Sequence, residues 1–305
     1  MMTKLPLLCV LIALPLAAAV NYTYDAAGRL IKVDYGNGSA ISYTYDNAGN
    51  VLSRSVEAST LRTFSTVSDA SFQAGATLAP NVIGAGFANG GLSTGTESAS
   101  TTPLPLKLAG TSVLVTGGST TAAVAAPLFF VSPGQINYLI PPGTPVGPAT
   151  VTIVNDTLGT VASGTLQIAA VAPGLFSANS SGQGVAVAEA VRASAGGAQT
   201  NVTVFQCGNT AGSCVPVPID LGPSTDTVVL VLFGTGIRGF SNIKNVTAAI
   251  GTTNAPVLFA GAQGGFVGLD QVNVQIPRSL IGSGVVNVVL TVDGQPSNAV
   301  TISIK

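Results

Sequence analysis

Two short segments that carry side-chain amides are the strongest candidates for recognition chemistry in this sequence. Gln135 and Asn137 stand two positions apart, and Gln271 and Asn273 repeat the same spacing. Residues at i and i+2 of a β-strand share one face, so each pair would present two amides to one surface. Such amides could hydrogen-bond the hydroxyl groups of a sugar. The alternative is that they hold adjacent loops through backbone hydrogen bonds, and their recurrence favours this structural role.

Tyrosines near the N-terminus form a second candidate binding surface. Tyr24 and Tyr45 each end a Tyr-Thr-Tyr segment and each precede an aspartate. Their rings could stack on sugars. Pairing of aromatic side chains between neighbouring strands is the simpler interpretation, and we favour it.

Residues suited to catalysis are scarce. The chain has no histidine, which is the commonest general base and the commonest transition-metal ligand. We predict no catalytic residue, no metal site and no cofactor. An unrecognised active site would need a cleft that brings together at least two of four acidic residues, Asp156, Glu189, Asp220 and Asp270.

The first residues predict export from the cytoplasm. Lys4 precedes an apolar stretch at residues 5–16, and alanines at positions 17–19 supply a small-residue cleavage site. We therefore expect residues 1–19 to be a signal peptide. The mature chain is then expected to be extracellular or at the cell surface, with no membrane span.

Two cysteines follow the predicted signal peptide, Cys207 and Cys214, with six residues between them. Outside the cytoplasm such a pair is expected to be oxidised. We predict a disulfide that closes this short loop. A zinc site would need two further ligands, and the sequence offers no histidine and no other cysteine after the signal peptide.

A glycine-rich segment at residues 234–239 has the Gly-x-Gly-x-x-Gly spacing of dinucleotide-binding turns. That function requires a helix directly after the turn. Residues 240–250 lack helical periodicity, so we expect a strand-to-turn corner without a nucleotide.

The charge of the chain excludes one class of partner. Charged residues make up only 8% of the sequence, and the formal net charge is −1. No basic stripe is present to hold phosphates, so we expect no nucleic-acid partner.

Apolar and polar residues alternate in many segments, which predicts half-buried strands. Residues 286–292 show this pattern, with valine or leucine at every second position. Residues 228–233 are continuously apolar, which predicts a central strand covered on both faces. Turns rich in glycine and proline separate these segments. The sequence therefore indicates an all-β chain built of sandwiches.

A short internal repeat relates residues 22–30 to residues 43–51, an offset of 21 residues. An aspartate and a glycine in each copy suit a tight turn, so we expect β-hairpins over residues 20–56. The repeat resembles the YD repeat of Rhs and teneurin-like proteins, whose many copies wind a β-shell. Two copies cannot close a shell. The resemblance implies a surface β-module that could associate with carbohydrate.

A larger repeat divides the rest of the chain into two similar halves. Residues 126–130 and 135–141 recur at residues 255–259 and 271–277. A weaker echo relates residues 82–87 to residues 232–237. The expected boundaries are a linker at 57–71 and two domains at 72–170 and 171–305.

The larger repeat resembles the Solibacter-type uncharacterised C-terminal domain, found at the ends of secreted acidobacterial proteins. The resemblance covers residues from about 71 to 305. It is carried by segments such as Val131-Ser132-Pro133-Gly134-Gln135-Ile136-Asn137 and Ala172-Pro173-Gly174-Leu175-Phe176. It implies two tandem immunoglobulin-like domains of the TIG type and no established activity.

These observations predict a secreted or cell-surface protein with a structural or adhesive role and without catalytic activity. The alternative is a carbohydrate-binding module that acts on extracellular polysaccharide. The expected partner is accordingly an extracellular glycan or another surface protein. An enzyme with an unrecognised site is the third hypothesis.

Overall fold

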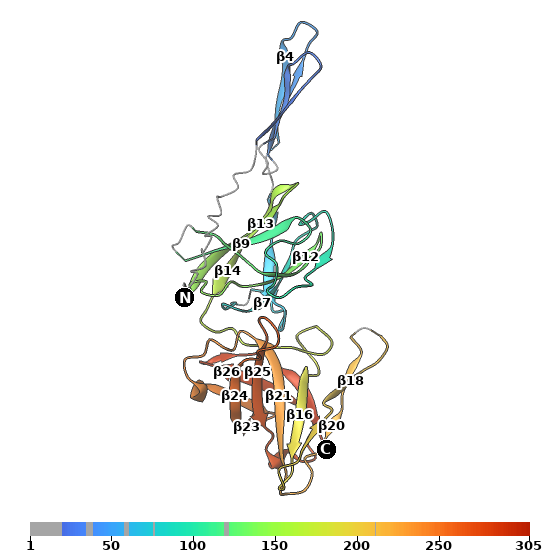
Figure 1. Ribbon diagram of the computed structural model, residues 1–305, viewed down its shortest axis with the longest axis vertical. Helices are drawn as coiled ribbons and strands as arrows, with labels where there is room; N and C mark the ends of the chain where they lie inside the picture. The colour runs from blue at the N-terminus through green and yellow to red at the C-terminus, as the bar shows by residue number, and fades with distance from the viewer. Residues whose placement is uncertain (1–19, 35–38, 58–60, 76, 119–121, 211) are drawn as a thin grey trace, which may run out of the picture. The chain divides into compact units, whose positions relative to one another are not determined.

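The computed structural model describes residues 20–34, 39–57, 61–75, 77–118, 122–210 and 212–305. The predicted signal peptide and its cysteine lie outside these residues. Nearly all regular structure is β-strand, as the sequence predicts, and the only helical elements among the described residues are the two 3₁₀ turns η1 (Ile243–Asn245) and η2 (Arg278–Leu280) (Figure 1). The chain divides into two compact units, one formed by residues up to 61 with 158–160, the other by residues 62–157 and 161–305.

The first unit is a four-stranded antiparallel sheet in the order β1-β2-β3-β4. Its strands are β1 (Asn21–Tyr24), β2 (Leu30–Asp34), β3 (Ala40–Tyr45) and β4 (Val51–Glu57). The aspartate of each repeat closes its turn: Asp25 Oδ1 accepts the N–H groups of Ala27 and Arg29, each at 2.9 Å. Asp46 does the same in the second copy. The short repeat is therefore two hairpins of the same construction.

The second unit begins with a β-sandwich whose two sheets enclose one apolar core. The first sheet has the order β10-β9-β13-β14-β5, with strands Val124–Ala125, Thr111–Gly117, Gly147–Asn155, Gly159–Ile168 and Arg62–Thr63. The other has the order β6-β7-β12-β11-β8, with strands Ser65–Ser68, Ile83–Phe87, Gln135–Leu139, Leu128–Val131 and Glu97–Ser98. Ile136 and Tyr138 point from β12 into the core and are fully buried. Gln135 and Asn137, which alternate with them, therefore point outward.

A second sandwich follows, with its own core. One sheet has the order β17-β16-β21-β25-β24, with strands Gln199–Val202, Ala188–Ala193, Thr227–Thr235, Asp270–Gln275 and Val257–Ala262, and β15 (Gly174–Leu175) pairs with β21. The other has the order β20-β28-β26-β22-β23, with strands Pro218–Ile219, Val300–Ile304, Gly284–Val292, Val246–Ile250 and Thr253–Ala255, and β27 (Gln295–Pro296) pairs with β26. The hairpin of β18 (Phe205–Cys207) and β19 (Cys214–Pro216) forms a separate two-stranded sheet.

The two sandwiches share one strand order. The sheet β10-β9-β13-β14-β5 corresponds to β23-β22-β26-β28-β20, and in both the last strand pairs in parallel with its neighbour. The strands β6-β7-β12-β11 correspond to β16-β21-β25-β24. Even a bulge recurs, between Leu128 and Phe130 in one half and between Val257 and Phe259 in the other. The larger sequence repeat is thus a repeat of structure.

Three expectations about these elements need correction. Residues 62–63 and 65–68, expected to belong to a linker, form β5 and β6 of the first sandwich. Phe64 between them is 2% exposed, so this Ser/Thr-rich segment is anchored by one aromatic ring. β-Branched threonine and valine suit strands as well as linkers, which explains the error.

The strand β21 is central, but only one of its faces is fully covered. Val228, Leu230 and Leu232 are buried, whereas Val229, Val231 and Phe233 are partly exposed. The continuous apolar run therefore does not mark a strand buried on both sides. Of these outward residues, Phe233 lines a cleft.

The weak echo between residues 82–87 and 232–237 is out of register. Gln135 lies opposite Phe87 and Gln271 lies opposite Phe233, so Phe87 corresponds to Phe233 and not to Ile237, four positions later. The two segments looked alike in sequence because their glycines have the same spacing. Gly86 makes room for the Phe64 ring, whereas Gly236 forms a turn with φ 77°.

Candidate functional site

A cleft of about 1030 Å³ opens in the second unit, between residues of both sandwiches. The first sandwich contributes outward side chains of β7 and β12 and the segment after β6. The second contributes β16, β21 and the loops at residues 176–180 and 263–269. This volume lies at the upper end of the range of about 300–1,000 Å³ usual for small-molecule sites, so the cleft is large enough to hold a ligand.

A chain of three polar side chains forms one wall of the cleft. Gln135 Nε2 donates to Asn137 Oδ1 at 2.7 Å, and Asn137 Nδ2 donates to Asp69 Oδ1 at 3.3 Å. The outward positions of Gln135 and Asn137 on β12 place both amides in the cleft, as the sequence predicts for one strand face. Asp69, from the segment expected to be a linker, was missed by sequence reasoning.

The only charges that the described lining of the cleft can carry are negative. Asp69 and Glu189 are its only ionisable lining residues, with no lysine or arginine among the described residues that line it. Burial raises the pKa of the Asp69 carboxyl, because its charged form loses hydration there. Glu189 projects from β16 into solvent. The site therefore disfavours anionic ligands and suits a neutral one with hydroxyl or amide groups.

Phenylalanines supply the apolar surface of the cleft: Phe72, Phe87, Phe176, Phe233 and Phe266. Phe87 and Phe233 occupy equivalent positions on β7 and β21, so the two sandwiches contribute the same kind of side chain. Phe266 is 72% exposed, which is unusual for a large apolar residue. Flat apolar faces beside amides and a carboxylate are what a ligand with one apolar face and several hydroxyls requires.

Two strained backbone positions lie at the cleft. Phe72 has φ 52° and Ser180 has φ 55°, a region that side-chain-bearing residues rarely adopt. Both residues line the cleft. Such strain persists only where the surroundings hold it, and it is commonest at functional sites.

Gln271 and Asn273 repeat the internal hydrogen bond of the first pair, with Gln271 Nε2 donating to Asn273 Oδ1 at 2.8 Å. Neither lines the cleft. The bond itself is therefore a shared structural feature of the two sandwiches, and only Gln135 and Asn137 combine it with a place in the cleft.

The predicted tyrosines, Tyr24 and Tyr45, belong to the first unit and are not among the residues that line this cleft. Tyr45 donates from its hydroxyl to the Leu30 carbonyl at 2.7 Å, and the guanidinium of Arg29 lies 4.9 Å from the centre of its ring. Tyr45 thus joins the two hairpins. Tyr24 is 57% exposed and carries no such contact among the described residues.

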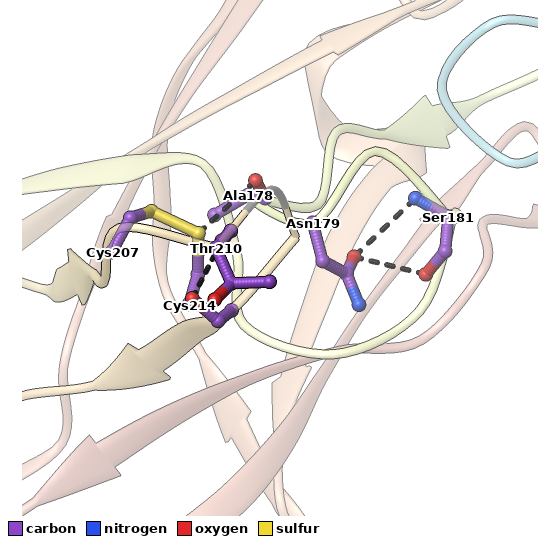
Figure 2. The surroundings of a disulfide bond; sticks show 7 residues. Ala178, Asn179, Ser181, Cys207, Thr210 and Cys214 are labelled. Carbon is purple, nitrogen blue, oxygen red and sulfur yellow. Dashed lines mark hydrogen bonds between the residues drawn. A yellow bond between two sulfur atoms is a disulfide. The ribbon is translucent and has the colours of Figure 1, made fainter.

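The predicted disulfide is present. Cys207 and Cys214 lie opposite one another on β18 and β19 and are bonded through their sulfur atoms. Figure 2 shows Cys214 Sγ facing the Ala178 carbonyl oxygen, 3.3 Å away. This is a contact and not a hydrogen bond, because a disulfide sulfur has no proton to donate. The neighbouring Asn179 accepts the Ser181 N–H at 3.3 Å and the Ser181 hydroxyl at 2.9 Å. The disulfide hairpin therefore braces the loop that forms one cleft wall.

The glycine-rich segment at residues 234–239 is a joint between the sandwiches. Thr235 is fully buried, accepts the Ile83 N–H at 3.1 Å and donates to the Gly268 carbonyl at 2.9 Å. A Cβ at Gly236 would lie 2.1 Å from the Ala172 carbonyl oxygen. The segment runs from the end of β21 into a turn, as the sequence predicts, and Gly236 is required by the close approach of the Ala172 backbone.

The four acidic residues considered for catalysis are not brought together. Asp156 pairs with Lys107 at 2.7 Å and Asp220 with Lys305 at 3.4 Å. Asp270 is fully buried and pairs with Arg238 at 2.6 Å. Burial raises the pKa of Asp270 against the opposing hydrogen bonds from Ile237 and Arg238. Glu189 alone of the four lines the cleft.

One motif escaped the sequence analysis. Residues 91–95 have the Gly-x-Ser-x-Gly spacing of a serine nucleophile. Ser93 is 4% exposed, and its hydroxyl donates to the Ala109 carbonyl and accepts the Gly95 N–H. The Ser93 hydroxyl therefore holds the conformation of a loop.

The described residues also contain no group of three side chains able to hold a metal ion.

Comparison with known proteins locates one family within the chain. Residues 20–60 match the family model described as RHS Repeat, in agreement with the resemblance of the short repeat. A search of the curated proteins found no match. No helix in the described part of the chain is long and apolar enough to cross a membrane.

Proposed function

We propose that the chain is an extracellular or cell-surface protein with a structural and adhesive role. The observation that carries this proposal is the all-β chain of hairpins and two like sandwiches, whose first part matches an RHS repeat. The disulfide at Cys207 and Cys214 supports an oxidising compartment. A non-catalytic role accords with the lack of histidine and with the separation of the acidic residues.

The location can be tested with the full chain expressed in a bacterium. We expect it in the medium or on the outer surface, where protease added to intact cells cleaves it. Cys207 and Cys214 should resist alkylation until a reductant is added. Retention in the cytoplasm with two free thiols would contradict the proposal.

The sandwiches are further proposed to be immunoglobulin-like domains of the Solibacter-type C-terminal family. Their shared strand order and shared bulge support an origin by duplication. Neither feature identifies a ligand, because one fold serves many functions.

A second candidate function is binding of a neutral carbohydrate in the cleft. It is favoured by the chain Gln135–Asn137–Asp69 beside several phenylalanines. An array of neutral and acidic glycans tests it. The full chain should be retained on neutral glycans and not on sulfated or uronic acid glycans, because the cleft carries two carboxyl groups and no lysine or arginine among its described lining residues. Failure to bind any neutral glycan would remove this function and leave the structural role standing.

A further inference from the structure

A second hollow adjoins the cleft on the other side of one exposed aromatic ring. It has a volume of about 560 Å³ and is lined by residues of the first sandwich, including Phe129 and Leu104, and by the loop of residues 265–269. Phe266 and Leu269 line both this hollow and the cleft. The two spaces are therefore neighbours that share a wall.

The loop that carries Phe266 is fixed at its base. Gln263 Oε1 accepts the N–H groups of Gly265 and Phe266, at 2.8 and 3.2 Å. The Gly268 carbonyl accepts the buried Thr235 hydroxyl at 2.9 Å. Gly268 lies so close to the first sandwich that a Cβ would come within 2.7 Å of Leu139. The exposed ring is thus presented by a built loop.

The second hollow differs from the cleft in its chemistry. None of its described lining residues is charged, and its polar groups come from Ser100, Thr101 and Thr102. The remaining surface is mainly apolar, with Phe129 and Phe266 as its rings. One ligand that filled both spaces would need apolar faces and neutral hydroxyls along its whole length, with Phe266 against its middle.

We propose that the cleft and the second hollow form one groove that holds a linear, neutral oligosaccharide across Phe266. This inference rests on the carbohydrate function proposed above and extends it from a sugar to a chain of sugars. A flat aromatic ring offers a pyranose face an apolar surface, and the amides and hydroxyls on either side serve its hydroxyl groups. No lysine or arginine is found among the described residues that line either space, which disfavours a polyanion as the occupant.

The test compares neutral gluco-, manno- and xylo-oligosaccharides of one to six units by titration calorimetry with the full chain. Affinity should rise with length until both spaces are filled. Phe266→Ala should weaken binding of the longest chains by about fivefold to tenfold, and it should weaken binding of single sugars by clearly less. Phe259→Ala is the matched control, because Phe259 is 42% exposed and lines neither space.

The possible failures are distinguishable. Binding that ignores length and Phe266 would overturn the groove and leave the carbohydrate function intact. Binding of an extended apolar peptide in place of any sugar would overturn both, as would the absence of all sugar binding. Phe266 is 72% exposed and Phe259 is 42% exposed, so both variants should melt close to the wild type. Binding is measured at a temperature at which both variants remain folded.

Discussion

At the scale of single residues, hydrogen-bond partners separate side chains of the same type into structural and exposed roles. Gln135 and Gln271 make the same bond to an asparagine two positions later, but among the described residues only the first pair continues to a carboxylate. Tyr24 and Tyr45 are likewise equivalent by sequence. Among the described residues, only Tyr45 both contacts an arginine through its ring and donates a hydrogen bond to a backbone carbonyl. Sequence spacing alone could not have separated the members of either pair.

The carboxyl of Asp69 gives a prediction with a defined sign. Its pKa in the folded state lies above the unfolded value of about 3.9. The folded chain therefore binds more protons between those two values, and the contribution of Asp69 to stability falls as pH rises through that window. Asparagine cannot ionise. The difference in Tm, Asp69→Asn minus wild type, should thus become more positive from pH 3 to pH 7.

Thermal unfolding over that pH range checks this prediction. Other carboxyl groups titrate in both proteins and cancel in the difference. A constant difference would mean that folding leaves the pKa of Asp69 unchanged, and a difference that becomes more negative as pH rises would mean that the fold lowers it. Either result would contradict the electrostatic description of the cleft.

Some residue-level expectations followed from simple arithmetic. The disulfide could be predicted because only two cysteines follow the expected signal peptide. The outward amides could be predicted from a two-residue period on β12. Asp69 could not, because its role depends on Asn137, 68 positions away.

At the scale of elements, alternation predicted strands well and predicted their surroundings poorly. The valines and leucine of residues 286–292 form β26, as expected. The run of β21 is apolar on both faces, yet one face is buried in the core and the other is partly exposed, with Phe233 in the cleft. The sequence of a strand shows how apolar each of its faces is. Whether a face is buried depends on which other element packs against it.

The joint at Gly236 supplies a second prediction. Gly236 has φ 77°, and a Cβ there would lie 2.1 Å from the Ala172 carbonyl oxygen. Gly143 has φ 79° but nothing within 4 Å of the same position. Both substitutions to alanine incur the cost of a left-handed backbone, about 1–2 kcal/mol. Gly236→Ala adds the clash and should lose more than about 3 kcal/mol in total.

Urea unfolding of the two alanine variants measures this difference directly. Failure of Gly236→Ala to fold, with Gly143→Ala folding normally, would agree with the joint. Equal losses in the two variants would mean that the segment at residues 234–239 does not bear on the packing of the two sandwiches.

At the scale of the whole molecule, the duplication could be predicted from the sequence and the cleft could not. The larger repeat predicted two halves of like construction, and their strand orders agree. The cleft arises where outer residues of one half meet loops of the other. No single repeat encodes such a space, because each half taken alone presents only an open sheet face.

Duplication also supplies the sharpest control for function. Both sandwiches carry a hydrogen-bonded Gln-x-Asn pair, but only one pair borders the cleft. The direct measurement is the binding of a neutral oligosaccharide to two double variants, Gln135→Ala with Asn137→Ala and Gln271→Ala with Asn273→Ala. The first should bind at least about tenfold more weakly than wild type, and the second should match wild type within about twofold. Equal binding by the two variants would contradict a ligand site in the cleft.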